Sequence, residues 1–186
     1  DFTGDKIFKD KFLKNIIISE EAKFWKFLSS KKFLDEKRIE LDTRLLKNFY
    51  LNKGYYNVNI ESTSASLTDD GFILKFNINS GEKFYFNRLS LIIPADYEKN
   101  NFSEIYKSFN YLENKSYSLN EIKKILDQIN TLALSKQYEF IDAKLEENII
   151  DNNKLDIKIT IGESKKYYVN RINIMSFYGF RKRYWK

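Results

Sequence analysis

The chain has 186 residues, 42% of them hydrophobic and 17% aromatic, so it can bury a packed core and does not have the composition of a disordered protein. It contains no cysteine and no histidine, which excludes disulfides, thiolate or imidazole metal sites and catalysis by those side chains. Its net charge of +6 indicates either affinity for an anionic partner or merely a lysine-rich composition, because the lysines are spread among 26 acids. No apolar run is long enough to span a bilayer as a helix.

The first predicted unit consists of a short strand, two helices and a hairpin. Only residues 1–3 precede Gly4, so little of an opening strand is expected, and a short helix follows at about 10–18. The apolar spacing within residues 35–53 predicts a longer helix that ends at Gly54, because glycine readily adopts the left-handed conformation that stops a helix. Alternating apolar residues over 56–67 and 72–78, on either side of a turn, then predict a β-hairpin.

The second predicted unit repeats this order. Residues 84–93 predict its opening strand, and a short helix is expected at about 102–111. Ser118 and Glu121 have the spacing of a capping box, and apolar residues then recur at helical spacing with Leu126 near the centre of the stripe. The second hairpin is predicted from two alternating segments, 140–150 and 155–161.

An internal repeat defines the organisation. Residues 83–91 (KFYFNRLSL) match residues 166–174 (KYYVNRINI) at an offset of 83, and a Gly-Glu pair precedes each. The sequence therefore predicts an α+β fold of tandem β-α-α-β-β modules, each a three-stranded mixed sheet packed on one face by two helices. The expected divisions are a module over 1–81 that lacks most of its first strand, a complete module over 82–163, and the first strand of a further module with a divergent tail over 164–186.

The segment Tyr50-Leu51-Asn52-Lys53-Gly54-Tyr55 resembles the helix-to-strand signature of POTRA domains, the modules of BamA-type outer-membrane protein assembly factors. The resemblance covers about residues 1–174 and places the chain at modules three and four of that family, with the start of five. The second unit departs from the pattern at Gln137, which replaces the glycine, and the tail 175–186 does not match. Other similar segments are residues 3–8, 77–81 and 168–172, and an aromatic insert at 23–28.

The resemblance implies a non-enzymatic scaffold in the periplasm, attached to the outer membrane through a C-terminal barrel outside this chain. The implied partners are unfolded outer-membrane β-barrel proteins and accessory lipoproteins of the assembly complex, with periplasmic chaperones as further candidates. No cofactor, metal or nucleic acid is expected. The residues agree with this, because Asp69-Asp70 is typical of a turn and Glu146 and Glu147, adjacent on a strand, point to opposite faces.

The strand over residues 57–66 is the candidate binding site. It is rich in Ser, Thr and Asn and carries one charge, Glu61, whereas natural edge strands are usually protected by lysine, proline or bulges. Such an edge can accept a partner strand through main-chain hydrogen bonds, although an edge covered by a neighbouring subunit, or simply left free, would explain the same composition. The expected binding residues are Asn57, Val58, Asn59, Ile60, Glu61, Ser62, Thr63, Ser64, Ala65 and Ser66.

Two further sets of residues are candidates. Short glycine-containing junctions predict limited bending between modules, with Ser80, Gly81, Glu82, Gly162, Glu163 and Ser164 as the hinge residues. The segment Phe24, Trp25, Lys26 and Phe27 interleaves rings with cations, and is interpreted as a partner-docking loop or as an inter-helix loop whose rings close the core. The alternative function is a basic nucleic-acid-binding module, which depends only on charge and on such aromatic segments and has no RRM or KH signature to support it.

Overall fold

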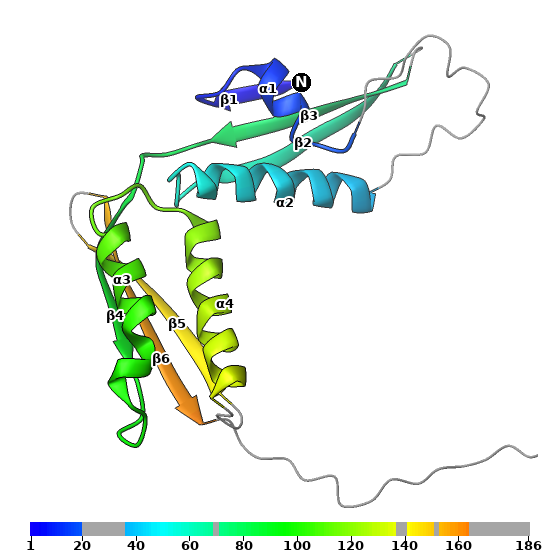
Figure 1. Cartoon of the computed structure of the whole chain (residues 1–186). Helices are drawn as coiled ribbons and strands as arrows, with labels where there is room; N and C mark the ends of the chain where they lie inside the picture. The colour runs from blue at the N-terminus through cyan, green and yellow to red at the C-terminus, as the bar shows by residue number, and fades with distance from the viewer. Residues whose placement is uncertain (20–35, 69–70, 137–140, 151–152, 164–186) are drawn as a thin grey trace, which may run out of the picture.

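The computed structural model describes residues 1–19, 36–68, 71–136, 141–150 and 153–163, and within them forms two three-stranded sheets (Figure 1). The strand orders are β1-β3-β2 and β4-β6-β5. In each sheet the last strand of the module lies in the centre, parallel to the first strand and antiparallel to the second. The predicted α+β fold of β-α-α-β-β modules is therefore confirmed. No helix among the described residues is long and apolar enough to cross a membrane.

The first module includes the opening strand, which is short but paired. Its four residues lie parallel to the central strand, from Phe2 opposite Phe76 to Asp5 opposite Asn79. The predicted helix 10–18 ends early, at Lys14. The elements are β1 (Phe2–Asp5), α1 (Asp10–Lys14), α2 (Glu36–Asn52), β2 (Asn59–Thr68) and β3 (Gly71–Asn79).

The short first helix has a tertiary cause. Asp42 of α2 is fully buried, and its carboxylate accepts the backbone N–H groups of Ile18 at 2.7 Å and Ser19 at 3.3 Å. A helix continuing to residue 18 would engage the Ile18 N–H in its own ladder. The buried carboxylate instead holds the chain in a non-helical turn, because a buried charge requires hydrogen-bond donors.

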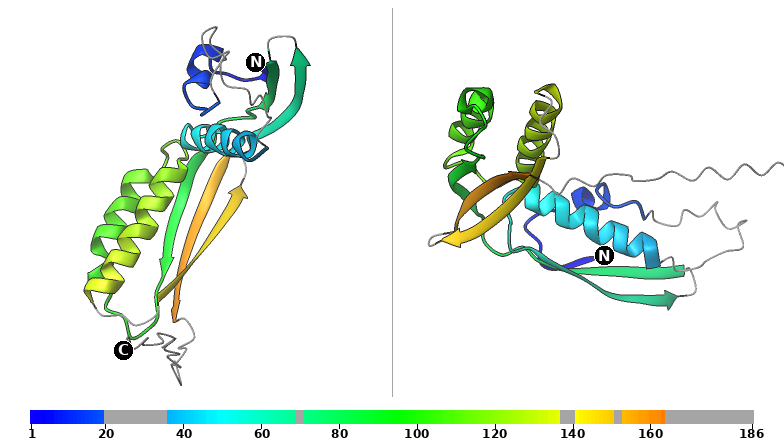
Figure 2. Two further views of the ribbon diagram at one scale, coloured as in Figure 1. Left: turned by 90° about the vertical axis from the view of Figure 1, so that its right-hand side faces the viewer. Right: turned by 90° about the horizontal axis from the view of Figure 1, so that it is seen from below.

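The second module has helices along one face of its sheet (Figure 2). Its opening strand contains a bulge between Phe86 and Leu89, and Asp156 accepts hydrogen bonds there from the Asn87 side chain at 2.7 Å and the Arg88 N–H at 3.1 Å. The elements are β4 (Tyr85–Ile92), the 3-10 helix η2 (Lys99–Phe102), α3 (Ser103–Leu112), α4 (Leu119–Ser135), β5 (Ile141–Ile150) and β6 (Lys154–Glu163).

Helix α4 differs in two respects from the prediction. Its buried stripe is centred on Ile125 and Ile129, at 2% and 0% exposure, whereas Leu126 lies at the flank and is half-buried. Ser118 is the N-cap residue, but its side chain makes no capping hydrogen bond, and Glu121 pairs with Lys124 at 2.6 Å. The predicted capping box is therefore wrong, because the Ser118 side chain makes no capping hydrogen bond and the Glu121 carboxylate pairs with Lys124.

Each module has its own apolar core. Leu46, Tyr50, Phe76 and Ile78 are central to the first core, and a separate cluster fills the second module. Leu51, near the end of α2, is partly buried and packs against both cores. The two modules therefore share an apolar contact at the end of α2, where the first module meets the second (Figure 1).

Candidate functional site

Strand β2 lies at one edge of the first sheet, and within the described residues it pairs with β3 alone. Its side chains alternate at the start, with Ile60 in the core and Asn59 and Glu61 exposed. Asn57 and Val58 precede the strand, which begins at Asn59, and Val58 is 5% exposed and belongs to the core. The structure thus places eight of the ten predicted binding residues, 59–66, on an edge strand.

A bulge divides this edge. Ser62 lies opposite Phe76 and Ser64 lies opposite Lys75, so Thr63 is an extra residue without a partner in the ladder. Bulges twist a strand locally and are one of the devices that limit edge-to-edge pairing. The edge is therefore less open than its composition predicts, and a straight partner strand would follow either residues 59–62 or residues 64–68.

The edges of the second sheet differ in character. Strand β5 carries four charged residues, and its Glu146 accepts from Lys158 at 2.9 Å. The outer side of β4 is occupied at its start, where Phe86 N–H donates to the Lys115 carbonyl at 2.8 Å and the Phe86 carbonyl accepts from Asn114 N–H at 2.9 Å. Strand β2, in contrast, has fewer charged residues than β5, and no described segment forms hydrogen bonds along its outer side.

The first predicted hinge is a packed junction in the structure. Ser80 is fully buried, and its N–H donates to the Asp5 carbonyl at 3.2 Å. Gly81 adopts a left-handed φ of 64°, and its N–H donates to the Asn79 side chain at 3.3 Å. Glu82 accepts a hydrogen bond from the Asn153 side chain. In the second predicted hinge, Gly162 and Glu163 are paired residues of β6, and Ser164 lies outside the described residues.

The turn after α2 also contacts the second module through its backbone. The Gly54 carbonyl accepts from the Phe84 N–H at 2.8 Å, and the Asn52 side chain accepts from the Asn120 N–H at the start of α4 at 2.8 Å. Gly54 has φ 98°, a conformation that glycine adopts without strain. The family-like signature at residues 50–55 therefore serves both to stop α2 and to hold the next module.

A carboxylate with two tyrosine donors completes this joint. The hydroxyls of Tyr56 and Tyr117 each donate to one oxygen of Glu147, both at 3.0 Å. The two rings meet edge to face with centroids 5.0 Å apart. Burial, followed by the nearby Glu147 charge, raises the pKa of Tyr56 to about 12 and shifts the pKa of Tyr117 in the same direction, so both remain donors at neutral pH.

Sequence reasoning missed this cluster, although one signal was available. Ala143, Leu145 and Glu147 occupy alternate positions of β5, so the acid lies on the apolar side of its strand. The neighbouring Glu146 faces the other way and pairs with Lys144 at 3.2 Å and with Lys158. Opposite orientations of the two adjacent acids were predicted and are confirmed.

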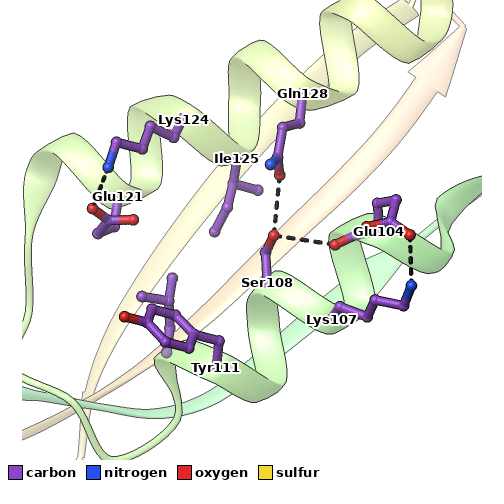
Figure 3. Close-up of a pocket in the computed structure, with 9 residues that line it drawn as sticks. Glu104, Lys107, Ser108, Tyr111, Glu121, Lys124, Ile125 and Gln128 are labelled. Carbon is purple, nitrogen blue, oxygen red and sulfur yellow. Dashed lines mark hydrogen bonds and ion pairs between the residues drawn. The ribbon is translucent and has the colours of Figure 1, made fainter.

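The aromatic candidates Phe24, Trp25, Lys26 and Phe27 lie outside the described residues. A pocket of about 250 Å³ lies between α3 and α4 (Figure 3). Its charges are paired within each helix, Lys107 with Glu104 and Lys124 with Glu121, both at 2.6 Å. The described residues contain no cluster of acidic side chains able to hold a metal ion. The pocket thus offers neither a free charge nor a metal site for chemistry.

Comparison with known proteins agrees with this geometry. Residues 1–81 match the POTRA family model, described as "Surface antigen variable number repeat". The chain is 22% identical over 174 residues to the outer membrane protein assembly factor BamA of Neorickettsia risticii, covering 94% of this chain and 23% of that protein. It is 22% identical over 177 residues to BamA of Neisseria meningitidis, covering 94% and 22%. The chain therefore spans about a quarter of the length of these relatives.

Solved structures show the same fold. Haemophilus influenzae BamA POTRA3-5 superposes with a TM-score of 0.66 at 16% identity, covering 88% of this chain and 64% of that one. BamA from Haemophilus ducreyi lacking POTRA domains 1-3 gives a TM-score of 0.53 at 12% identity, covering 80% and 28%. Residues 1–81 thus match the POTRA family model, and the chain as a whole is a tandem of modules with the fold of the solved BamA POTRA domains.

Proposed function

We propose that this chain is a periplasmic binding segment of an outer-membrane protein assembly machine, and that β2 captures extended segments of unfolded β-barrel proteins by strand addition. The relatives named as outer membrane protein assembly factors support the general role. The observation that carries the specific mechanism is the position of β2, which pairs with β3 on one side and with no described segment on the other.

Strand addition suits a partner of variable sequence. The bonds that hold an added strand are main-chain hydrogen bonds, which every non-proline residue can make, so binding is weak and tolerant of peptide sequence. The side-chain amide of Asn59 donates to the Glu61 carboxylate at 2.9 Å, and both side chains are exposed. Neither is a lysine, the residue that commonly protects an edge strand against pairing. The straight stretch before the bulge, residues 59–62, is the preferred docking register because the ladder there is regular.

The proposal extends to the other predicted partners. Accessory lipoproteins would dock on the segment 24–27, because three of its four residues are aromatic and aromatic side chains are enriched at protein interfaces. The chain that leads into this segment is held at Ile18 and Ser19, because the backbone N–H groups of both residues donate to the Asp42 carboxylate. Strand capture and lipoprotein docking would then use different segments of the chain.

Two adjacent proline substitutions, Glu61→Pro and Ser62→Pro, test the edge. In a regular antiparallel ladder, neighbouring residues point their N–H groups to opposite sides, so one of the two points toward β3 and the other outward. Proline lacks the N–H donor. The outward substitution should abolish binding while the module stays folded, and the inward one should weaken the β2–β3 pairing itself.

The measurement is an NMR titration with peptides from unfolded outer-membrane β-barrel proteins. Lys75→Glu, on the exposed face of the neighbouring strand, is the control, and at moderate salt it should change binding little because exposed charges are screened. Shifts concentrated at residues 24–27, or two proline variants that both bind like the parent, would show that the edge is not the binding site.

A further inference from the structure

The two long helices end at equivalent positions but in different surroundings. Helix α2 (Glu36–Asn52) and helix α4 (Leu119–Ser135) each have 17 residues and are related by the same offset of 83 as the sequence repeat. Leu51 of α2 is partly buried between the cores of both modules. Its equivalent in α4 is Leu134, which is 81% exposed, more than any other large hydrophobic residue that the structure describes.

Strand β6 ends at the same end of the second module as α4, the helix that carries Leu134. In the first module, β3 ends at Asn79 beside Asn59 of β2, shortly after the end of α2. In the second, β6 ends with Glu163 beside Ile141, the residue that opens β5 shortly after α4 ends. Figure 1 shows the C-terminal ends of α4 and β6 at the same end of the module. Glu163, the last described residue of β6, therefore lies at the end of the module where α4 ends.

Those following residues repeat the segment that covers the end of α2. The start of the first copy, at Phe84, donates its N–H to the Gly54 carbonyl at 2.8 Å and packs its ring against Tyr56 with centroids 5.6 Å apart. In the second copy, 166–174, the position of Phe84 is taken by Tyr167, also an aromatic residue. The same chemistry that holds the end of α2 is thus encoded again after β6.

We propose that the end of α4, centred on Leu134, is the docking surface for residues 166–174 of this chain, which lie against it as the start of β4 lies against the end of α2. Exposure of a leucine to water is unfavourable, and covering it with an aromatic side chain removes that cost. Each module would then present its successor with a leucine one residue before the end of its long helix. The continuity of the chain with this surface is what selects residues 166–174 over a second molecule.

Thiol labelling tests the proposal cleanly, because the chain contains no cysteine. Leu134→Cys in the full chain places one thiol at the proposed surface. The comparison variants are Leu51→Cys, at the joint that the structure describes, and Tyr111→Cys, at a position of the same module that is 66% exposed. A maleimide should label Leu134→Cys about tenfold more slowly than Tyr111→Cys, since a packed side chain reacts only through local opening. Circular dichroism verifies that each variant is folded.

A second substitution identifies the occupant. Adding Tyr167→Asp should raise the labelling rate of Leu134→Cys to that of Tyr111→Cys, and should leave the rates of Leu51→Cys and Tyr111→Cys unchanged. The proposal is overturned if Leu134→Cys reacts as fast as Tyr111→Cys in the parent background. It is also overturned if the protection survives Tyr167→Asp, or if it appears only as protein concentration rises, which would assign the surface to a second copy of the chain.

Discussion

Removal of the Glu147 carboxylate is the sharpest test of the inter-module joint. In Glu147→Ala, the hydroxyls of Tyr56 and Tyr117 lose the acceptor that each now holds at 3.0 Å. A hydrogen bond to a charged group contributes roughly 1.5–3 kcal/mol. Since Glu147 is only half-buried, the lower end applies, and two bonds give a loss of about 3 kcal/mol in the free energy of unfolding. Tyr117 is 2% exposed, so solvent cannot replace its lost acceptor without rearrangement.

The adjacent acid provides the matched control. Glu146→Ala removes ion pairs with Lys144 at 3.2 Å and Lys158 at 2.9 Å on the open face of the sheet. Exposed ion pairs contribute little to stability because solvent screens them, so this variant should lose much less stability than Glu147→Ala. Urea unfolding followed by circular dichroism gives both values. If Glu147→Ala loses no more than Glu146→Ala, the two tyrosine contacts do not stabilise the folded chain and the reasoning fails.

A double-mutant cycle separates the inter-module bond from the bond within the second module. Tyr56 belongs to the first module, so the coupling between Tyr56→Phe and Glu147→Ala measures the contact across the joint. Directly contacting residues usually couple by about 0.5–3 kcal/mol. Tyr56→Phe alone should also broaden the unfolding transition, because it removes one of the contacts that couple the two modules. Additive effects with a single unchanged transition would mean that the modules are coupled elsewhere, through Leu51 or the backbone contacts.

Three further outcomes are expected. Ile129→Ala should cost about 2–5 kcal/mol in urea unfolding, because Ile129 is fully buried and truncation leaves a cavity; a loss near zero would mean that the core of the second module is not packed around it. Gly54→Ala should cost about 1–3 kcal/mol, because φ is 98° and the added Cβ would lie 2.4 Å from the Ser116 hydroxyl; unchanged stability would show that the joint relaxes freely. Burial raises the pKa of Tyr50 and of Tyr56 to about 12, so the stability that their hydroxyls contribute is complete below pH 10.0 and is lost as pH rises through about 12. Because the chain has 13 tyrosines, the ionisation of these two is measured as the tyrosinate absorbance that Tyr50→Phe and Tyr56→Phe remove. That difference should appear together with the loss of the circular dichroism signal, and its completion by pH 10.0 in the folded chain would contradict the reasoning.

Local patterns in the sequence were sufficient for the order of the elements. The apolar spacing of residues 35–53 and the glycine after it predicted α2 and its end, since helix periodicity and the left-handed stop are properties of a few neighbouring residues. The alternation in residues 56–67 predicted the strand that proves to be at an edge, and the repeat predicted a second unit of the same kind. Composition alone also marked β2 as low in charge.

Only the tertiary structure decided how these elements meet. The first helix ends at Lys14 because Asp42, which lies 24 residues after Ile18, takes the N–H groups that would continue it. The bulge at Thr63 depends on register against β3, which no pattern within β2 records. The contact between Tyr56 and Glu147 joins residues 91 apart in sequence. Periodicity reports which face of an element is apolar, but a carboxylate turned toward a neighbouring module, or a leucine shared by two cores, is defined only when separate elements are brought together in space.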